Sequence, residues 1–431
     1  MAGRSSVKGE FIAFDDVIIV PGRSSVEPKE VDLTSKVTRN IWVSIPLVSS
    51  PMDTVTEWRM AVLLARLGAV GVIHRNMSRE EQARQVEKVK SSHPTPWSEV
   101  AKTNAGEPLS SIQLRLEEQG LGAAIVFDGN RLKGVYVVSG PRQEFWLAKA
   151  DSIAKLLLGV KPMPTIDGEG KLRVGAAISP FDLERAKLLE SKGVDFLVID
   201  VAHLHNSNAI RALRRLAREV SVDIVAGNLG TREAVLELVS VVDSIAGLRV
   251  GISSGSICTT GEVTGAGVPT LTAVIEAFEA LEELGLAGEI PIIADGGIRG
   301  AGDAAKAIIA GASAVMVGRL LAGAEEAPGA TVSIGGKLYK QYRGMASRGS
   351  IERGAAADRY LRRSKMIEEG VEGLVPYVGS AAQVLAEFAA GLQAALGYAG
   401  ASSIPEAWKA RLARASYGAA REMKPHSLVL G

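Results

Sequence analysis

The sequence predicts an α/β fold, a closed (β/α)₈ barrel of the TIM type with a small inserted α+β module. Three observations support this prediction. Eight short apolar runs alternate with amphipathic stretches along the 431 residues, as expected for parallel strands that helices cover. One connection between these runs is far longer than the others. Loops rich in glycine and hydroxyl side chains follow the later runs, where a barrel of this type carries its functional groups.

The apolar runs predict the strands in order, and the stretches between them predict the helices. The predicted strands are 45–50, 69–74, 174–179, 196–201, 223–228, 247–252, 291–296 and 314–319. The predicted helices are 78–90, 182–192, 208–219, 231–238 and 273–284. A doubly wound open sheet is the alternative fold. Eight strands favour the barrel, however, and no Gly-x-Gly-x-x-Gly follows the first run.

The long connection predicts the insert. After the second barrel helix, residues 91–166 contain a helical pattern at 108–119 and β-rich runs at 122–127 and 133–138. The turn Asp128-Gly129-Asn130 between these two runs is typical of a β-hairpin. We therefore expect a barrel built from residues 1–90 and 167–431. It includes a charged, glycine-rich flap loop at about 342–377, because loops of that length commonly serve as lids.

Composition excludes several classes of protein. The chain is 47% hydrophobic and 23% charged with a net charge of +1, which is ordinary for a globular protein with a sizeable core. It has no basic run that would indicate nucleic-acid binding and no apolar stretch of the ~18 residues that a membrane span needs. One cysteine excludes an intramolecular disulfide. These features predict a cytoplasmic protein with neither a nucleic-acid nor a membrane partner.

The single cysteine, Cys258, is the strongest chemical signal. A free cysteine is more often a small buried apolar residue than a catalyst, but the run Gly255-Ser256-Ile257-Cys258-Thr259-Thr260 favours a nucleophile because its small and hydroxyl residues leave room for a substrate. Glycines end the next two strands at Gly297 and Gly318, where barrels of this type bind phosphate through backbone N–H groups. Ser256 is then expected to donate to that phosphate, with Cys258 at the far end of the ligand.

Further motifs extend this pattern along the chain. They are Phe14-Asp15-Asp16-Val17, Ser49-Ser50-Pro51-Met52-Asp53-Thr54, Ile73-His74-Arg75-Asn76-Met77, Ala226-Gly227-Asn228, Ile293-Ala294-Asp295-Gly296-Gly297 and Tyr342-Arg343-Gly344-Met345. With the cysteine loop, they make the chain resemble the IMP dehydrogenase / GMP reductase family from about residue 10 to 425. The resemblance implies a (β/α)₈ enzyme with a purine mononucleotide substrate.

The resemblance also implies a reaction and a set of residues. The reaction is oxidation of inosine 5′-monophosphate (IMP) to xanthosine 5′-monophosphate (XMP) with NAD⁺ through a covalent cysteine thioimidate, in guanine nucleotide biosynthesis. Cys258 would attack the purine with Thr260 nearby, while Arg359 and Tyr360 in the flap would activate water. The implied substrate residues are Ser50, Met52, Ser256, Asp295, Gly297, Gly318, Arg319, Tyr342, Met345 and Glu369. Those implied for the cofactor are Asp200, Asn228, Arg249 and Gly251.

Two alternatives remain open at this point. One is a GMP reductase that uses NADPH and releases ammonia, and the other is a catalytically weak, regulatory purine-nucleotide-binding homologue. Gly261 stands where dehydrogenases of the family often have glutamine, and Arg319 stands where many relatives have serine. The Arg359-Tyr360 pair favours the dehydrogenase. Whether NAD or NADP is preferred stays open as well.

The resemblance finally implies an ion, an assembly and a regulatory insert. Family members bind potassium through carbonyls of the cysteine loop, here Ser253, Gly255 and Cys258, and through a neighbouring subunit's C-terminal segment, where Lys424 is a candidate replacement for the ion. They form homotetramers, some of which pair into octamers. Many carry two tandem CBS motifs in the insert. Residues 108–138 resemble one such motif, but 139–166 is too short for a second copy.

Overall fold

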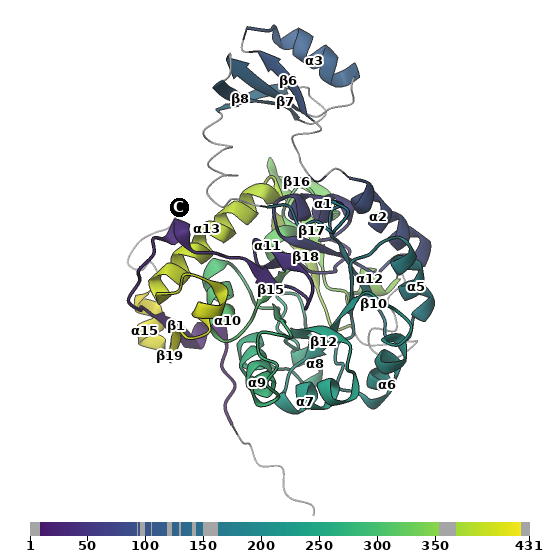
Figure 1. Cartoon of the computed structure of the whole chain (residues 1–431), viewed down its shortest axis with the longest axis vertical. Helices are drawn as coiled ribbons and strands as arrows, with labels where there is room; N and C mark the ends of the chain where they lie inside the picture. Colours follow the sequence, from purple (N-terminus) through teal and green to yellow (C-terminus); the bar gives the residue numbers. More distant parts are fainter. Residues whose placement is uncertain are drawn as a thin grey trace, which may run out of the picture.

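The computed structural model describes residues 9–92, 94, 100–104, 106–118, 123–128, 131–139, 144–149, 163–352 and 368–423. A closed barrel of parallel strands lies at its centre (Figure 1), as predicted. In order around the barrel, the strands are β4 (Leu47–Ser49), β5 (Val70–Ile73), β10 (Gly175–Ile178), β11 (Phe196–Ile199), β12 (Asp223–Leu229), β13 (Ile245–Val250), β14 (Ile292–Asp295) and β15 (Ala314–Val317). Strand β15 pairs with β4 and closes the ring.

All eight strands overlap the predicted runs. The sixth begins two residues earlier than predicted and ends at Val250 instead of residue 252. The backbone leaves the strand there because Gly251 has a φ of +119°, a conformation that β-strands do not contain. The glycine thus turns the chain into the loop that carries Cys258.

Helices surround the barrel. They are α1 (Trp58–Arg66), α2 (Arg79–Ser91), α5 (Leu183–Ser191), α6 (Ser207–Leu216), α7 (Arg232–Val241), α9 (Thr270–Glu283), α10 (Ala301–Ile309), the short α11 (Arg319–Ala322) and the long α13 (Ala381–Ala399). Side-chain hydrogen bonds cap the N-termini of several of these helices. At the start of α2, for example, the hydroxyl oxygen of Ser78 accepts from the amide of Glu81. Such caps satisfy amides that have no partner within the helix. None of the helices in the described part of the chain combines the length and apolar composition that a membrane crossing requires.

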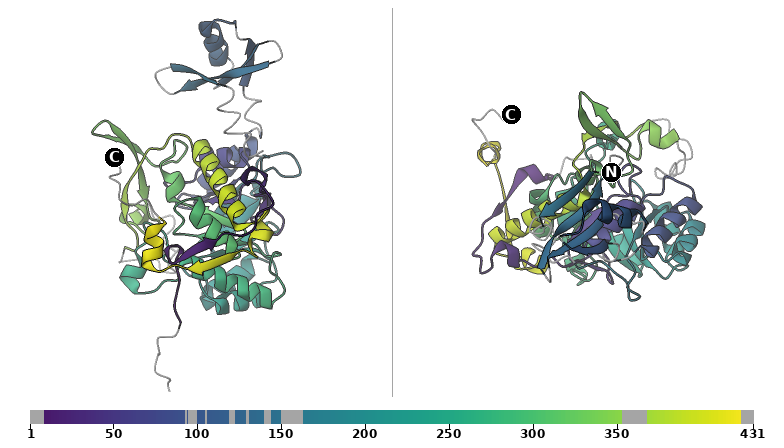
Figure 2. Two further views of the ribbon diagram at one scale, coloured as in Figure 1. Left: turned by 90° about the vertical axis from the view of Figure 1, so that its left-hand side faces the viewer. Right: turned by 90° about the horizontal axis from the view of Figure 1, so that it is seen from above.

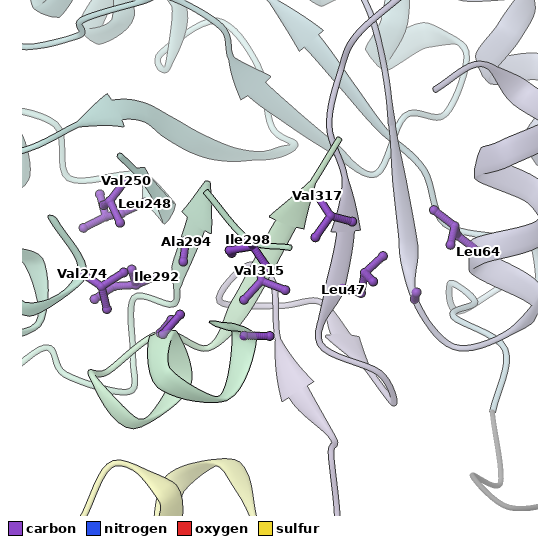
Figure 3. Close-up of a cluster of buried hydrophobic side chains, with 14 of the residues drawn as sticks. Leu47, Leu64, Leu248, Val250, Val274, Ile292, Ala294, Ile298, Val315 and Val317 are labelled. Carbon is purple, nitrogen blue, oxygen red and sulfur yellow. The ribbon is translucent and has the colours of Figure 1, made fainter. Parts of the chain in front are cut away.

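Two apolar layers hold the barrel together. The outer layer lies between strands and helices, and Figure 3 shows part of it, with Leu64 of α1 and Val274 of α9 in the same cluster as strand residues. The inner layer fills the barrel with residues such as Val198, Ile293 and Met316. A hairpin of β2 (Ser35–Lys36) and β3 (Trp42–Val43) contributes Val37, Ile41 and Val43 to this inner layer. The barrel is therefore a packed scaffold, and its loops carry the site.

The region predicted as a flap loop is partly a sheet. Strands β16 (Thr331–Ile334), β17 (Lys337–Arg343) and β18 (Glu372–Pro376) form an antiparallel sheet in that order. The β16–β17 hairpin stands out from the barrel in both views of Figure 2. The predicted loop at 342–377 is thus wrong at both ends, since β17 mixes charged and apolar residues and lacks the apolar run that revealed the barrel strands. Between β17 and β18 lies α12 (Arg348–Glu352), and residues 353–367, with Arg359 and Tyr360, lie outside the described residues.

A separate sheet lies in the long connection. It contains β6 (Val100–Asn104), β7 (Ala123–Asp128), β8 (Arg131–Ser139) and β9 (Glu144–Lys149) in that order, together with α3 (Leu109–Glu118). The antiparallel pair β7–β8 confirms the predicted hairpin, and α3 confirms the predicted helix. Strands β6 and β9 were not predicted. Lys90, at the start of this connection, forms an ion pair with Asp167, at its end, with 2.8 Å between Lys90 Nζ and the carboxylate. The same Nζ lies 2.9 Å from Asp195. The domain boundaries at 91–166 stay a prediction.

The two ends of the described chain are joined by a further strand pair. After the short helix η1 (Phe14–Asp16), β1 (Val17–Val20) pairs antiparallel with β19 (Arg411–Arg414). The remaining helices are η2 (Pro28–Glu30), α8 (Thr260–Thr264), α14 (Ile404–Ala407) and α15 (Tyr417–Glu422). This pair matters for the site because Phe14, the first residue of the helix η1 that precedes β1, lines a cavity of the site.

Candidate active site

The loop that carries Cys258 lies against the segment before β18. The amide of Thr259 donates to the carbonyl of Glu369 (3.1 Å), and the amide of Val371 donates to the carbonyl of Ile257 (3.0 Å). Between these two bonds, the backbones of Cys258 and Gly370 form an isolated antiparallel β-bridge. Two segments more than a hundred residues apart are thereby joined at the lone cysteine. The sequence predicted both segments for the site but not their pairing.

The Cys258 thiol begins a short line of polar groups. Its Sγ lies 3.3 Å from Thr260 Oγ1, to which the thiol donates, and the Thr260 hydroxyl donates to Glu369 Oε2 at 2.8 Å. A thiol, a hydroxyl and a carboxylate in contact form a path along which a proton leaves the sulfur. A nearby group that accepts this proton is what a cysteine nucleophile needs.

A cavity of about 690 Å³ contains the residues predicted to hold phosphate. Its walls include Ser256, Gly297, Gly318, Arg319 and Tyr342. Ser256 Oγ lies 3.4 Å from Tyr342 Oη. Burial raises the pKa of the Tyr342 phenol above its ordinary value, so at neutral pH the phenol keeps the proton that it would donate to an anion.

Glycine at position 318 keeps this cavity open. A Cβ there would lie 3.0 Å from Tyr342 Oη and 3.1 Å from Met52 Sδ, closer than ordinary van der Waals contact. Any side chain would occupy the space beside the hydroxyl groups of Tyr342 and Ser256. The glycine therefore lets a ligand approach both the backbone and these donors.

A smaller cavity of about 130 Å³ contains Cys258. It is also lined by Asn228, Arg249, Gly251, Thr260, Met345 and Glu369. The two cavities share walls made of Ser50, Met52, Ser253, Gly255, Asp295 and Tyr342. The site is thus elongated, with hydroxyl and glycine residues at one end, the thiol at the other and Asp295 between them. That order suits a ligand with an anionic group at one end and a reactive carbon at the other.

A buried network of charged hydrogen bonds lies beside the smaller cavity. Asp295 Oδ2 accepts hydrogen bonds from Arg249 Nε (2.9 Å) and from Asn228 Nδ2 (3.0 Å). Arg249 Nη1 also donates to Asp200 Oδ1 (3.1 Å), while Arg75 Nε lies 3.3 Å from Asp200 Oδ2. Arg249 and Asp200 are almost fully buried. Opposite charges alternate through this network, so each buried charge has a partner, as burial requires.

Asp200 has a different position from the one that the sequence suggested. It was predicted among the cofactor residues, yet it is fully buried and lies on the wall of neither cavity. Instead it holds Arg249, which does line the smaller cavity. Every other predicted site residue that the structure describes lines one or both cavities.

Asn228 offers an acceptor for a ligand at the smaller cavity. Its Nδ2 donates to Asp295 and to the carbonyl of Gly251. Its Oδ1 is buried without a hydrogen-bond partner among the described residues. Because buried polar atoms are rarely left unpaired, a ligand that brings an N–H group to Asn228 satisfies it, and the carboxamide of a nicotinamide carries such a group.

A second buried ion pair connects the barrel to β17. Asp53 accepts from Arg343 Nη2 (2.6 Å) and from Asn76 Nδ2 (2.7 Å). Burial alone would raise the pKa of Asp53, but the hydrogen bonds from Arg343 and Asn76 outweigh it and hold the pKa below its ordinary value. Three of the sequence motifs meet in this cluster. Sequence reasoning missed the contact because the motifs lie far apart along the chain.

The predicted potassium ligands lie on the cysteine loop. The carbonyl of Gly255 accepts from the amide of Cys258 (3.0 Å), so one of the three carbonyls already has a partner within the loop. Lys424 and the rest of the C-terminal segment at 424–431 lie outside the described residues. Among the residues described, no group of three or more His, Cys, Asp or Glu side chains is arranged to hold a metal. Potassium binding stays a prediction.

Comparison with known proteins identifies the family of the chain. The family model of the IMP dehydrogenase / GMP reductase domain matches residues 11–426. Inosine-5′-monophosphate dehydrogenase from Korarchaeum cryptofilum is 44% identical, with 96% of each chain covered, and the enzyme of that name from Thermoplasma acidophilum is 39% identical, with 98% of this chain and 95% of the relative covered.

A solved structure is similar along nearly its whole length. It is a cysteine-to-alanine variant of GMP reductase from Trypanosoma brucei in complex with guanosine 5′-monophosphate. The TM-score is 0.77 at 30% identity, with 98% of this chain and 99% of that chain covered. The family match and these near-full-length relatives show that the chain belongs to the IMP dehydrogenase / GMP reductase family, a family of enzymes.

Proposed function

We propose that this chain oxidises IMP to XMP with NAD⁺ through a covalent intermediate on Cys258, in guanine nucleotide biosynthesis. The observation that carries the proposal is the line from Cys258 through Thr260 to Glu369 at one end of an elongated site. Relatives of 36–44% identity that are named inosine-5′-monophosphate dehydrogenase support the choice of substrate. The proposal goes beyond family membership, because the family also includes reductases.

The nucleotide is proposed to lie along both cavities. Its phosphate accepts hydrogen bonds from Ser256 and Tyr342, from the amides at Gly297 and Gly318, and from the Arg319 guanidinium. Asp295 accepts from the ribose hydroxyls at the wall that the two cavities share. The base then reaches the thiol end, where Ser50, Met52, Met345 and Glu369 surround it. The resemblance to the family implies these assignments, and the order of donors and acceptors along the site supports them.

In the first chemical step, the sulfur of Cys258 adds to C2 of the purine. The thiol proton passes to Thr260 as the Thr260 proton passes to Glu369, and a new S–C2 bond forms. A hydride then leaves C2, which produces the thioimidate. NAD⁺ would supply the hydride acceptor when bound, and Asn228, Arg249 and Gly251 would hold its nicotinamide, for which Asn228 Oδ1 offers an acceptor. Asp200 would fix the orientation of the Arg249 guanidinium, because it accepts a hydrogen bond from Arg249 Nη1.

In the second step, water adds to C2, a proton leaves the water, and the S–C2 bond breaks to release XMP and restore the thiolate. Arg359 and Tyr360 are proposed to activate this water on the basis of the sequence resemblance alone. The Thr260–Glu369 pair offers a second route, because a carboxylate behind a hydroxyl accepts a proton from any donor that contacts the hydroxyl.

GMP reductase is the second candidate, and one observation favours it. The similar solved structure is a GMP reductase with bound guanosine 5′-monophosphate. The same thiol would add to C2 of GMP, and ammonia would leave before hydride from NADPH arrives. A regulatory homologue that binds a purine nucleotide without turnover is the third candidate.

Absorbance at 340 nm distinguishes the three candidates. Purified protein is mixed with IMP and NAD⁺ in one cuvette and with GMP and NADPH in another, both with potassium. The proposal predicts rising absorbance in the first alone, abolished by Cys258→Ala. Falling absorbance in the second alone assigns the reductase. Binding of IMP without turnover in either cuvette assigns the regulatory homologue.

The cellular setting is proposed as well. We infer a cytoplasmic homotetramer, with octamers as a further assembly, on the resemblance to the family and on the composition of the chain. Potassium would lie between subunits at the cysteine loop. Sedimentation with and without potassium tests the assembly, and a single monomeric species in both conditions would contradict it.

A further inference from the structure

Arg75 is a buried arginine that the proposed mechanism does not use. It follows strand β5 in the motif Ile73-His74-Arg75-Asn76-Met77 and is only 2% exposed. It lines neither of the two cavities. A guanidinium stays charged at physiological pH, and a charged group is rarely buried without a partner. The partners of Arg75 therefore indicate its role.

Arg75 holds Asp200 at two points. Its Nη2 donates to the backbone carbonyl of Asp200 at 2.9 Å, and its Nε lies 3.3 Å from the carboxylate oxygen Oδ2. The other carboxylate oxygen, Oδ1, accepts from Arg249 Nη1 at 3.1 Å. The fully buried carboxylate thus joins two guanidinium groups, with one oxygen for each. A movement of this carboxylate toward one arginine weakens its bond to the other.

This contact crosses the mouth of the barrel. Strands β5 and β13, from which Arg75 and Arg249 come, lie opposite each other in the ring of strands, and Asp200 follows β11, halfway between them. On its other side, Arg249 donates through Nε to Asp295 of β14 at 2.9 Å. Arg249 is therefore shared by two carboxylates, and of these only Asp295 lines the cavities.

The charges of these four side chains balance. Without Arg75, Arg249 would be the one cation of the four for both carboxylates. The side chain of Asp200 is fully buried and that of Asp295 is 16% exposed, so water stabilises the charge of Asp295 better than that of Asp200. Arg249 would then move toward Asp200 and away from the cavity. Arg75 opposes this movement because it compensates the charge of Asp200.

We propose that Arg75 is a positioning residue that acts through Asp200 and keeps the Arg249 guanidinium at the wall of the smaller cavity. Arg75 itself touches no ligand and exchanges no proton. The inference rests on the proposed function, because that function assigns Arg249 to the nicotinamide. It extends that function to a residue of the opposite strand that sets the affinity for the dinucleotide.

Equilibrium binding tests the inference without turnover. In a Cys258→Ala parent, titration calorimetry measures the Kd of NAD⁺ at saturating IMP and the Kd of IMP alone. Arg75→Met should raise the Kd of NAD⁺ about tenfold, as for a lost hydrogen bond to a charged group. The Kd of IMP should change less than about threefold, because its phosphate and base lie outside this network. Arg75→Lys keeps the charge but not the fork of donors, so its effect should be smaller than that of Arg75→Met.

Two further variants separate positioning from stability. Arg185 is also buried and pairs with Asp182 at 3.0 Å, but among the described residues its hydrogen bonds reach neither Asp200 nor Arg249. Arg185→Met should destabilise the fold, while the Kd of NAD⁺ stays within about twofold of the parent value. Arg75→Met combined with Asp200→Asn removes the buried charge that attracts Arg249. Its Kd for NAD⁺ should return to within about threefold of the parent value.

Parental NAD⁺ affinity in Arg75→Met overturns the inference. Weaker binding in the double variant than in Arg75→Met also overturns it, because a purely structural role predicts a further loss. If Arg75→Met does not fold, the charge-balanced double variant decides, and a Kd raised about tenfold there overturns the inference.

Failure of the proposed function appears in the parent itself. A parent that binds NADPH with GMP in place of NAD⁺ with IMP contradicts the dehydrogenase, and the same variants are then compared with that pair of ligands. A parent that binds IMP but no dinucleotide overturns both proposals.

Discussion

The floor and the rim of the site are built in opposite ways. The floor, defined by Asp200, Asn228, Arg249 and Asp295, lies at the ends of barrel strands, and charged hydrogen bonds join its members. The rim is defined by Ser253, Cys258, Thr260 and Glu369. These residues lie on loops and at the first residue of the short helix α8, they are only partly buried, and their contacts involve mainly hydroxyl groups. The floor therefore supplies a fixed electrostatic environment, and the rim supplies groups that exchange protons.

This difference separates stability from chemistry. A buried charge that loses its partner destabilises the fold, whereas a half-buried hydroxyl or thiol contributes little to folding and much to a reaction that uses it. Substitutions in the floor should lower both the free energy of unfolding and activity. Substitutions in the rim should lower activity alone.

The largest effect is expected for Cys258→Ala. Loss of the nucleophile should lower turnover of IMP by more than roughly 10³-fold, while the free energy of unfolding changes by less than about 1 kcal/mol, because the side chain is partly exposed. Initial rates at 340 nm and urea unfolding measure the two quantities. Retained turnover would show that the cysteine takes no part in the reaction. A large loss of stability would contradict the expected difference between rim and floor.

Arg249→Met should produce the largest loss of stability. It leaves Asp200 and Asp295 without their shared partner, and breaking a buried ion pair costs about 3–5 kcal/mol. The free energy of unfolding should fall by that amount. The control is the double variant Asp200→Asn with Arg249→Met, which should recover part of the loss because one uncompensated charge is gone. Equal stability of the single variant and the parent would show that the network does not support the floor.

Glu369→Gln should slow the reaction without destabilising the fold. Glutamine keeps the shape of the side chain and still accepts from Thr260, but it takes up no proton. We expect turnover to fall about 10²-fold, a typical contribution of general acid–base catalysis, with the free energy of unfolding within about 1 kcal/mol of the parent value. Thr260→Val should lower turnover similarly, and the double variant should add little to either. Additive losses would mean that the two residues do not act as one path.

The smallest effect is a pH dependence of stability from Asp53, which joins the barrel to β17. Because its pKa is lower in the folded protein than its ordinary value of 3.8, its contribution to stability is complete above that value and is lost as pH falls through the lowered pKa. One proton changes the free energy of unfolding by at most about 1.4 kcal/mol per pH unit. Urea unfolding between pH 5 and 2.5 (roughly the range of that titration) should show a shallower decline in Asp53→Asn than in the parent. Parallel declines would exclude Asp53 as the source.

The barrel was predictable from the sequence, and the sheets outside it were less so. Parallel strands that are buried on both faces appear as continuous apolar runs, which made all eight barrel strands visible. Strand β17 has no such run, because Lys337 and Leu338 are exposed and Lys340 is buried, and its apolar residues do not cluster. The predicted loop at about 342–377 therefore begins within this strand, at Tyr342.

Most of the residues that the sequence predicted for the site line the two cavities, but the contacts between them were not predicted. The barrel brings the ends of its strands to one face, so the Cys258 loop, Asp295 and Gly318 were expected together. No local pattern reveals that Thr260 contacts Glu369, because that distance depends on how two loops fold. Nor does a motif distinguish a residue that lines a cavity from one that is buried behind its wall, as Asp200 is.

The pairing of β1 with β19 has a consequence for the order of folding. Val17–Val20 leaves the ribosome long before Arg411–Arg414, so at roughly 5–20 residues per second the first strand lacks its partner for tens of seconds. Phe14 lies three residues before that strand, and its ring lies within 4 Å of the position that a Cβ on Gly297 would occupy. The phosphate end of the site is therefore expected to be completed only after Arg411–Arg414 has been synthesised, later than the residues of the thiol end.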